Sequence, residues 1–273
     1  MSIYRRIHLI GISNYHRLDS HERRRGACFV PIPLSLSQGR EEISRRVDDI
    51  REIIGYEFNN PMILQQAFTH HSYKESCSSL DRLAYIGDAI LTFAVTKDPG
   101  MLTRLRYANV DTEKLARATM KLGLHEFLRD NIFLLEPQIE EFREAIAKYP
   151  LHSPGLIDAP KVLADIFEAL IGAIFLDCKS SFDTTWEVVK KLLEPVITTA
   201  TLPKHPVSQL LELCQSRRLS LEMRDSWRDD GVVEFVIDDA CVGRAEYKAK
   251  RVIAKNRAAL DAYNHLKRDQ ALL

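Results

Sequence analysis

The sequence has no excess of either charge, few cysteines and no long apolar run. Its 38 lysines and arginines balance 38 aspartates and glutamates, so any attraction for nucleic acid must come from local clusters. The five cysteines are odd in number and never spaced as CxxC, which favours a reduced, intracellular protein without structural zinc. No apolar run approaches the roughly 20 residues of a membrane helix. We therefore expect no membrane association.

The length leaves room for one medium domain and a small one, or for one large domain. The first forty residues are rich in arginine, poor in acid and contain Pro31 and Pro33. Two interpretations stay open for them: a disordered tail, and a targeting segment, because organelle transit peptides share this composition. The expected location is the nucleus or the cytoplasm, with an organelle as the alternative.

Helix signals dominate the first two thirds of the chain. Apolar residues recur at helical spacing within several segments. The residues at the ends of these segments are typical helix caps and breakers. The predicted helices include residues 41–54 before Gly55, 60–69 with Pro61 at the first position, and 111–122 with Asp111 as N-cap and Gly123 after the end.

Two apolar segments carry carboxylates at matched spacing. Asp81 and Asp88 lie seven positions apart on one helix face, and Asp165 and Glu168 form an i, i+3 pair. Acids among apolar neighbours are costly to bury unpaired, and we expect Asp88, Asp165 and Glu168 to be half-buried. Packed together, the two helices would converge their oxygens on a site for Mg²⁺. The alternative is two ordinary amphipathic helices whose acids face water.

The order of elements changes after a linker-like stretch over residues 198–206. The pattern beyond it predicts a small α+β unit. Its expected elements are a helix over 206–217, strands over 219–224, 232–237 and 240–244, and a helix over 247–267.

At the acidic segments the chain resembles the ribonuclease III family. Residues 80–89 look like the signature helix of that family, and 161–170 like its downstream acidic helix. Residues 67–73 resemble the block before the signature, and 109–116 a further helix start. The likeness covers roughly residues 46–199. The helix, three strands and helix that follow, with the run 254–260, resemble a double-stranded RNA-binding domain.

This resemblance implies an all-α RNase III-type helical domain followed by a small α+β (α-β-β-β-α) double-stranded RNA-binding domain. It also implies an endoribonuclease that hydrolyses double-stranded RNA with Mg²⁺, or Mn²⁺ as substitute, in RNA processing. The products would carry 5′-phosphate and 3′-hydroxyl ends. The implied limits are 1–44 for the tail or targeting segment, 45–199 for the catalytic domain, 200–205 for the linker and 206–268 for the RNA-binding domain.

The resemblance also assigns site residues. Asp88, Asp165 and Glu168 would hold the metal, Asp88 and Glu168 would be catalytic, and Asp81 would be an auxiliary acid. Tyr85 would contact a partner subunit; the alternative is a core tyrosine. Because the chain has one such domain, cutting both RNA strands demands a homodimer.

The sequence departs from the family pattern at two places. Ala84 stands where the signature has a metal-binding glutamate, and a turn through Pro99-Gly100 replaces a longer helix end and loop. A second interpretation is therefore open: a catalytically weak or inactive protein that kept the scaffold and binds double-stranded RNA. A third is a helical interaction protein with no RNA role.

A basic cluster opens the last predicted helix. Lys248, Arg251 and Lys255 are the expected RNA contacts, with the latter two at i, i+4. Val252 stands where the family often has a second lysine, and residues 227–231 form a turn without the family's usual loop. Duplex RNA is recognised by shape and phosphates, so no sequence preference is predicted. His70 and His71 have no partners at zinc spacing and are interpreted as structural.

Overall fold

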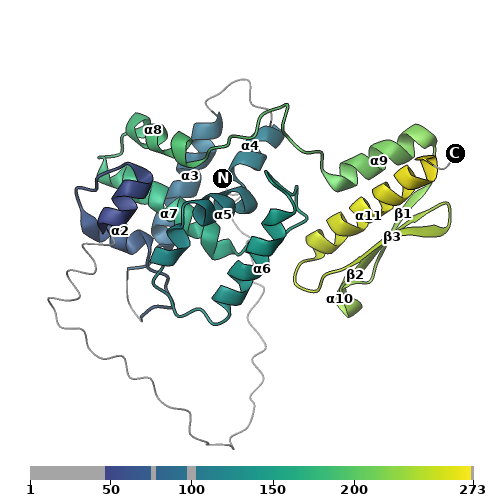
Figure 1. Cartoon of the computed structure of the whole chain (residues 1–273), viewed down its shortest axis with the longest axis horizontal. Helices are drawn as coiled ribbons and strands as arrows, with labels where there is room; N and C mark the ends of the chain where they lie inside the picture. The colour runs from purple at the N-terminus through teal and green to yellow at the C-terminus, as the bar shows by residue number, and fades with distance from the viewer. Residues whose placement is uncertain (1–46, 75–77, 97–102, 272–273) are drawn as a thin grey trace, which may run out of the picture. The chain divides into compact units, whose positions relative to one another are not determined.

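A computed structural model describes residues 47–74, 78–96 and 103–271 (Figure 1). The predicted tail and the Pro99-Gly100 turn lie outside the described residues. Along the described ranges, no helix combines the length and the apolar character needed to cross a bilayer. The first part contains a helix over 47–54, then α2 (Pro61–Ala67), α3 (Asp81–Thr96), α4 (Thr103–Val110), α5 (Thr112–Lys121), the 3-10 turn η1 (Leu124–Phe127), α6 (Leu135–Ala147), α7 (Lys161–Asp177) and α8 (Phe182–Leu192).

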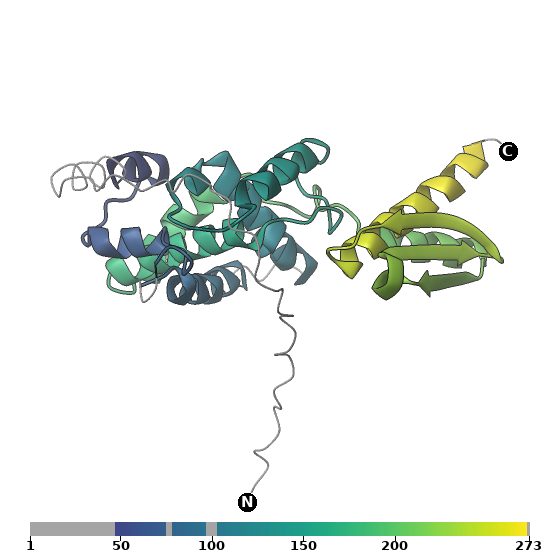
Figure 2. The same ribbon diagram turned by 90° about the horizontal axis from the view of Figure 1, so that it is seen from below.

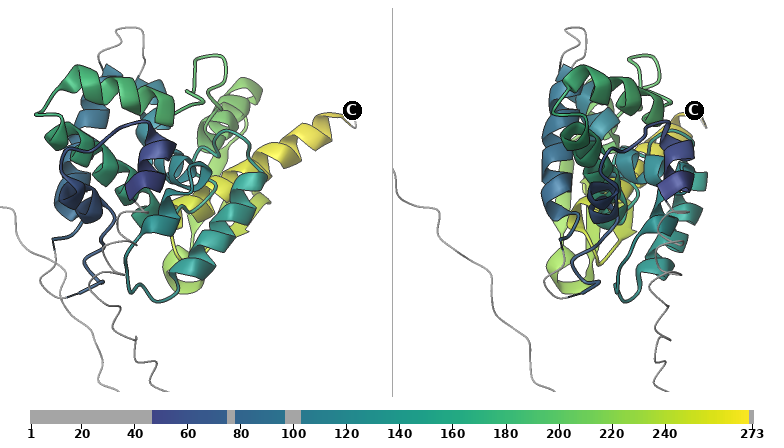
Figure 3. Two further views of the ribbon diagram at one scale, coloured as in Figure 1. Left: turned by 60° about the vertical axis from the view of Figure 1, so that its left-hand side comes forward. Right: turned by 90° about the vertical axis from the view of Figure 1, so that its left-hand side faces the viewer.

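Helix α7 is the centre of this helical part, and the other helices gather around it (Figures 1 and 3). Leu163, Ile166, Phe167, Leu170 and Ile174 are all inaccessible to solvent. A helix that is apolar on nearly every side is stable only when its neighbours cover it. The acids of α7 therefore lie where that cover is interrupted.

Two glycines let α3 and α7 touch through their backbones. A Cβ atom added to Gly87 of α3 would stand 1.8 Å from the carbonyl oxygen of Glu168 on α7. A Cβ atom added to Gly172 of α7 would stand 2.1 Å from the carbonyl oxygen of Leu83. No side chain fits in either gap, so these glycines permit the close helix contact that positions the site.

Two predicted helix starts are confirmed by hydrogen bonds, and one predicted helix end by a backbone angle. The side chain of Asn60 accepts from the Met62 amide at the start of α2. Asp111 accepts from the Lys114 amide at the start of α5, and Gly123 follows that helix with φ of 67°. Local cap chemistry therefore sets these boundaries.

The second part has the expected order of helix, three strands and helix. The strands form an antiparallel sheet in the order β1-β2-β3, with Met223 opposite Phe235 and Phe235 opposite Gly243. Both long helices pack on one face of the sheet (Figure 2), around a core that includes Leu210, Phe235 and Ala258. The elements are α9 (Pro206–Arg217), β1 (Leu221–Asp225), α10 (Trp227–Asp230), β2 (Val232–Ile237), β3 (Ala240–Glu246) and α11 (Arg251–Ala271).

The structure differs from prediction at α10, where the sequence indicated a plain turn. Asp230 accepts hydrogen bonds from the Ser226 hydroxyl and the Val232 amide, and these bonds favour one helical turn. The Trp227 indole N–H donates to the Tyr247 carbonyl, 2.8 Å away. That bond fixes the segment before α11, which begins at Arg251 and not at the predicted residue 247.

The segment after α8 is anchored by a buried asparagine. The Asn109 side chain donates to the carbonyl oxygens of Leu105 and Ile197, at 2.9 Å each, and accepts from the Ile197 amide at 2.8 Å. Both polar groups of the amide are thereby satisfied, as burial requires. The contact ties the chain at Ile197 to α4.

Candidate active site

The two acidic helices bring their carboxylates to one pocket of about 400 Å³. Asp81 and Asp88 come from α3, and Asp165 and Glu168 from α7. The two segments, which are far apart in the sequence, therefore lie side by side as predicted. The remaining lining residues are Ala84, Tyr85, Thr112, Lys161 and Ala164.

The surroundings of Glu168 favour the protonated form of its carboxyl group. Burial raises the pKa of Glu168 to about 7, and the charges of Asp165 and Asp88 add to the effect. Lys161 acts in the opposite direction. Three acids therefore share one electrostatic environment, and added positive charge would stabilise it.

Lys161 supplies such charge within the protein. Its ammonium group is paired with the Asp165 carboxylate one turn further along α7. Burial alone would lower the pKa of Lys161, but the hydrogen bond and charge of Asp165, with Glu168 and Asp81, raise it overall. No role was predicted for this lysine from the sequence, although its i, i+4 spacing from Asp165 indicates the ion pair.

Asp81 lies at the rim of the pocket beside the histidine pair. The Ser79 hydroxyl donates to Asp81 at 2.6 Å, and Nδ1 of His71 lies 3.5 Å from the same carboxylate. The pKa of Asp81 is lowered, chiefly by the Ser79 hydrogen bond and then by His71 and His70. The rings of His70 and His71 stack with centroids 3.9 Å apart. His71 therefore contacts the candidate site directly and His70 lies behind it, a placement that was not predicted from the sequence.

The predicted site residues differ in how far their side chains are exposed to solvent. Asp165 and Glu168 are half-buried as expected, but the expectation for Asp88 was wrong, because Asp88 is exposed although it lines the same pocket. Tyr85 is 80% exposed, which excludes the alternative of a core tyrosine. Ala84 is buried and lines the pocket, so the position where the resemblance places a glutamate faces these acids.

As the side chains stand in the described residues, no group of three or more histidine, cysteine, aspartate or glutamate residues is arranged to hold a metal ion. The chemistry of the pocket nevertheless fits a hard cation. Its donors are carboxylate oxygens, the type that Mg²⁺ and Mn²⁺ prefer. The raised pKa of Glu168 also marks a concentration of negative charge that a cation would relieve.

The predicted RNA contacts lie around the start of α11. Lys248 lies 3.7 Å from Glu246, and Arg251 donates from Nε to Asp225 at 2.6 Å. Lys255 is half-buried, and the neighbouring Lys250 is paired with Asp158. RNA phosphates would therefore have to replace some of these ion pairs.

Comparison with known proteins gives the same assignment. Residues 81–179 match the family model described as Ribonuclease III domain. "Ribonuclease 3-like protein 3" of Oryza sativa subsp. japonica is 44% identical over 231 residues, covering 80% of this chain and 77% of the relative. "Endoribonuclease Dicer homolog 1" of the same organism is 39% identical over 236 residues, or 79% of this chain and 12% of that protein.

The chain therefore belongs to the ribonuclease III family. Its relatives are named as ribonucleases and endoribonucleases, so the family function is RNA cleavage. Among solved structures, the ribonuclease III nuclease domain from Campylobacter jejuni is 27% identical and covers 55% of this chain and 95% of that one, with a TM-score of 0.41.

Proposed function

We propose that this chain is a divalent-metal-dependent endoribonuclease that cleaves double-stranded RNA. The observation that carries the proposal is the single pocket in which carboxylates of α3 and α7 meet. Carboxylates that share a site repel one another, so bringing the acids of two distant helices together is unfavourable for folding. A cation bound between them would offset this repulsion.

Asp88, Asp165 and Glu168 would hold the cation, which would be Mg²⁺, with Mn²⁺ as substitute. When bound, the ion lowers the pKa of a water molecule and neutralises charge that develops on the phosphate. Asp88 and Glu168 would then be the catalytic acids, with Asp81 auxiliary at the rim. Ends with 5′-phosphate and 3′-hydroxyl are expected.

The test is cleavage of long duplex RNA by the purified chain with Mg²⁺ or Mn²⁺. Glu168→Gln keeps the size of the side chain and removes its charge, so cleavage should be lost while duplex binding is kept. Intact duplex with both ions for the parent chain would contradict the proposal. Equal loss of binding and cleavage in the variant would contradict the role of Glu168.

Two further parts of the proposal concern assembly and RNA binding. An exposed tyrosine at the pocket edge supports a homodimer, in which Tyr85 contacts the partner subunit. The α+β unit would be a double-stranded RNA-binding domain over residues 206–268, with the catalytic domain over 45–199.

The test of the dimer is Tyr85→Ala, which should shift the chain toward monomer in analytical ultracentrifugation. An unchanged sedimentation profile would remove Tyr85 from the interface.

One observation favours a second candidate function, a non-cleaving protein that binds duplex RNA. Ala84 lines the pocket, so an acid is missing where it would face the other carboxylates. Ala84→Glu separates the candidates: an under-liganded enzyme should need less Mg²⁺ and cleave about tenfold faster or more. If parent and variant both bind duplex and neither cleaves, the binding function is correct.

A further inference from the structure

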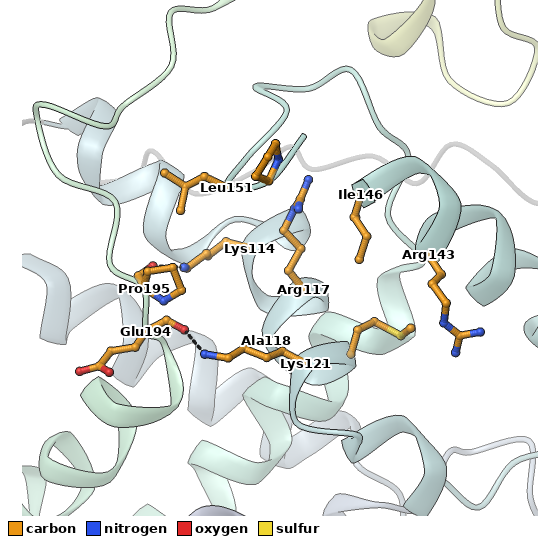
Figure 4. A pocket seen from close by; sticks show the side chains of 11 residues that line it. Lys114, Arg117, Ala118, Lys121, Arg143, Ile146, Leu151, Glu194 and Pro195 are labelled. Carbon is orange, nitrogen blue, oxygen red and sulfur yellow. Dashed lines mark hydrogen bonds between the residues drawn. The ribbon is translucent and has the colours of Figure 1, made fainter. Parts of the chain in front are cut away.

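A second pocket, of about 360 Å³, lies on the helical part and shares no lining residue with the carboxylate pocket (Figure 4). Lys114, Arg117 and Lys121 reach it from one face of α5, and Arg143 comes from α6. The other lining residues are Ala118, Met120, Ile146, Pro150, Leu151, Glu194 and Pro195. The pocket thus combines four cationic side chains with mainly apolar walls, and one of the four, Arg143, is paired with Glu140.

The lysines of this pocket have neutral partners. Lys114, which is buried, donates to the Pro195 carbonyl, and Lys121 donates to the Glu194 carbonyl at 3.0 Å. The carboxylate of Glu194 points away from Lys121 (Figure 4). Backbone carbonyls satisfy the N–H donors but leave the positive charges in place. Burial, then repulsion from Lys121 and Arg117, lowers the pKa of Lys114 to about 8.

Arg117 is held in position by a buried acid that is itself saturated. Its Nε donates to Glu113 at 2.9 Å, and Glu113 also accepts from the amide and hydroxyl of Ser153. Nη2 of Arg117 lies 2.8 Å from the same glutamate oxygen but off the direction of a hydrogen bond. Among the described residues this buried nitrogen has no hydrogen-bond partner. Buried donors normally have one, so the ion pair with Glu113 is what holds this nitrogen in place.

We infer that this pocket binds a phosphorylated nucleotide, with the phosphate at the cations of α5 and α6 and the base against the apolar walls. Arginine and lysine around a phosphate form charge-assisted hydrogen bonds, the strongest type available to these side chains. The volume lies in the usual range for small-molecule sites, which are mostly apolar with a few placed polar groups. An isolated phosphate ion would leave the walls formed by Met120, Ile146 and Leu151 without contact.

The nucleotide has two possible sources: a free nucleoside monophosphate, or the 5′-phosphorylated end of an RNA strand. Binding should be measured by calorimetry on the full chain carrying Glu168→Gln, in EDTA, so that neither metal nor cleavage contributes. The ligands are adenosine monophosphate, inorganic phosphate, and an RNA dinucleotide with a 5′-phosphate or a 5′-hydroxyl. The inference does not depend on nuclease activity, and this design tests it separately.

Lys121→Gln combined with Arg143→Gln removes two exposed cations of the pocket, and the fold should tolerate both changes. We expect nucleotide binding to weaken about tenfold or more. Lys148→Gln with Lys191→Gln removes the same charge from exposed positions outside the pocket and should leave binding unchanged. Tight binding of the monophosphate identifies a free nucleotide as sufficient, and binding of the 5′-phosphorylated dinucleotide alone identifies an RNA end; each supports the inference.

Three results would overturn it: neither adenosine monophosphate nor the 5′-phosphorylated dinucleotide binding more tightly than inorganic phosphate, the 5′-hydroxyl dinucleotide binding as tightly as the tighter of the two phosphorylated ligands, or equal binding by the pocket variant and its charge-matched control. Thermal unfolding of both double variants, compared with the parent, shows whether the fold is retained.

Discussion

Gly87 of α3 lies directly against the backbone of Glu168 on α7, with 1.8 Å between the position of an added Cβ atom and the glutamate carbonyl oxygen. Gly87→Ala should therefore push the helices apart. We expect a loss of about 1–3 kcal/mol in the free energy of unfolding, and weaker cleavage because the carboxylates separate. Urea unfolding measures the first effect. Arg82→Ala, at an exposed position of the same helix, is the control and should change little.

If Asp165 holds a cation as proposed, Lys161 should compete with that cation, because its ammonium group is paired with the Asp165 carboxylate. Lys161→Met removes the charge and keeps most of the side-chain length. An ion pair with one partner this exposed is worth at most about 1 kcal/mol, so the Mg²⁺ concentration for half-maximal cleavage should fall by about two- to fivefold.

A Mg²⁺ titration of cleavage measures this change, with Lys191→Met, an exposed lysine of α8, as the control. A higher Mg²⁺ requirement for Lys161→Met would mean that Lys161 assists the reaction and does not compete with the ion.

Asp177 at the end of α7 should make stability depend on pH. It accepts hydrogen bonds from the amides of Asn59 and Asn60 at 2.8 and 2.9 Å, and from the Tyr56 hydroxyl at 2.9 Å. Burial alone would raise the pKa of Asp177, but these bonds lower it overall. A lowered pKa in the folded state means stability that is present above the unfolded pKa and lost as the pH falls through the folded one.

Asp177→Ala should therefore lower the free energy of unfolding by about 1–3 kcal/mol at neutral pH. The difference from the parent should shrink as the pH falls below about 4, the ordinary pKa of an aspartate, and through the lower pKa of the folded state, where the parent carboxylate is protonated. Urea unfolding at a series of pH values measures it, with the exposed Asp49→Ala as control. A difference independent of pH would show that the charge of Asp177 contributes nothing.

Arg251 and Lys255 should carry part of the duplex binding. Replacing both with glutamine should reduce affinity for duplex RNA and flatten its dependence on salt, because about two fewer counterions are released. Cleavage at saturating RNA should be retained. Fluorescence anisotropy at several salt concentrations measures the slope. Lys179→Gln with Lys191→Gln removes equal charge elsewhere, and an equal slope for both pairs would remove Arg251 and Lys255 from the interface.

Elements with strong local signals were predictable from the sequence. The helix over 206–217 and the strand over 232–237 agree with α9 and β2 to the residue. Pro206 can begin a helix but not continue one. Gly231 precedes β2, and Asp238 and Asp239 follow it, all with positive φ. Such residues interrupt regular structure whatever the rest of the chain does.

The tertiary part of the site was less predictable. The spacing of Asp81, Asp88, Asp165 and Glu168 indicated that they could meet, but not that glycines would bring the two helices into backbone contact. The cationic pocket was missed for a similar reason. Arg143 and the lysines of α5 are neighbours only in the folded chain, and periodicity within one helix carries no information about the next.

Asn109 fixes the chain at Ile197, and α9 begins at Pro206. About eight residues lie between them, which span at most roughly 28 Å when fully extended. If the α+β unit binds RNA, this short linker keeps it near the helical part of the same chain. One duplex would then be both bound and cleaved by that chain, and a duplex long enough to contact both surfaces would bind with higher affinity.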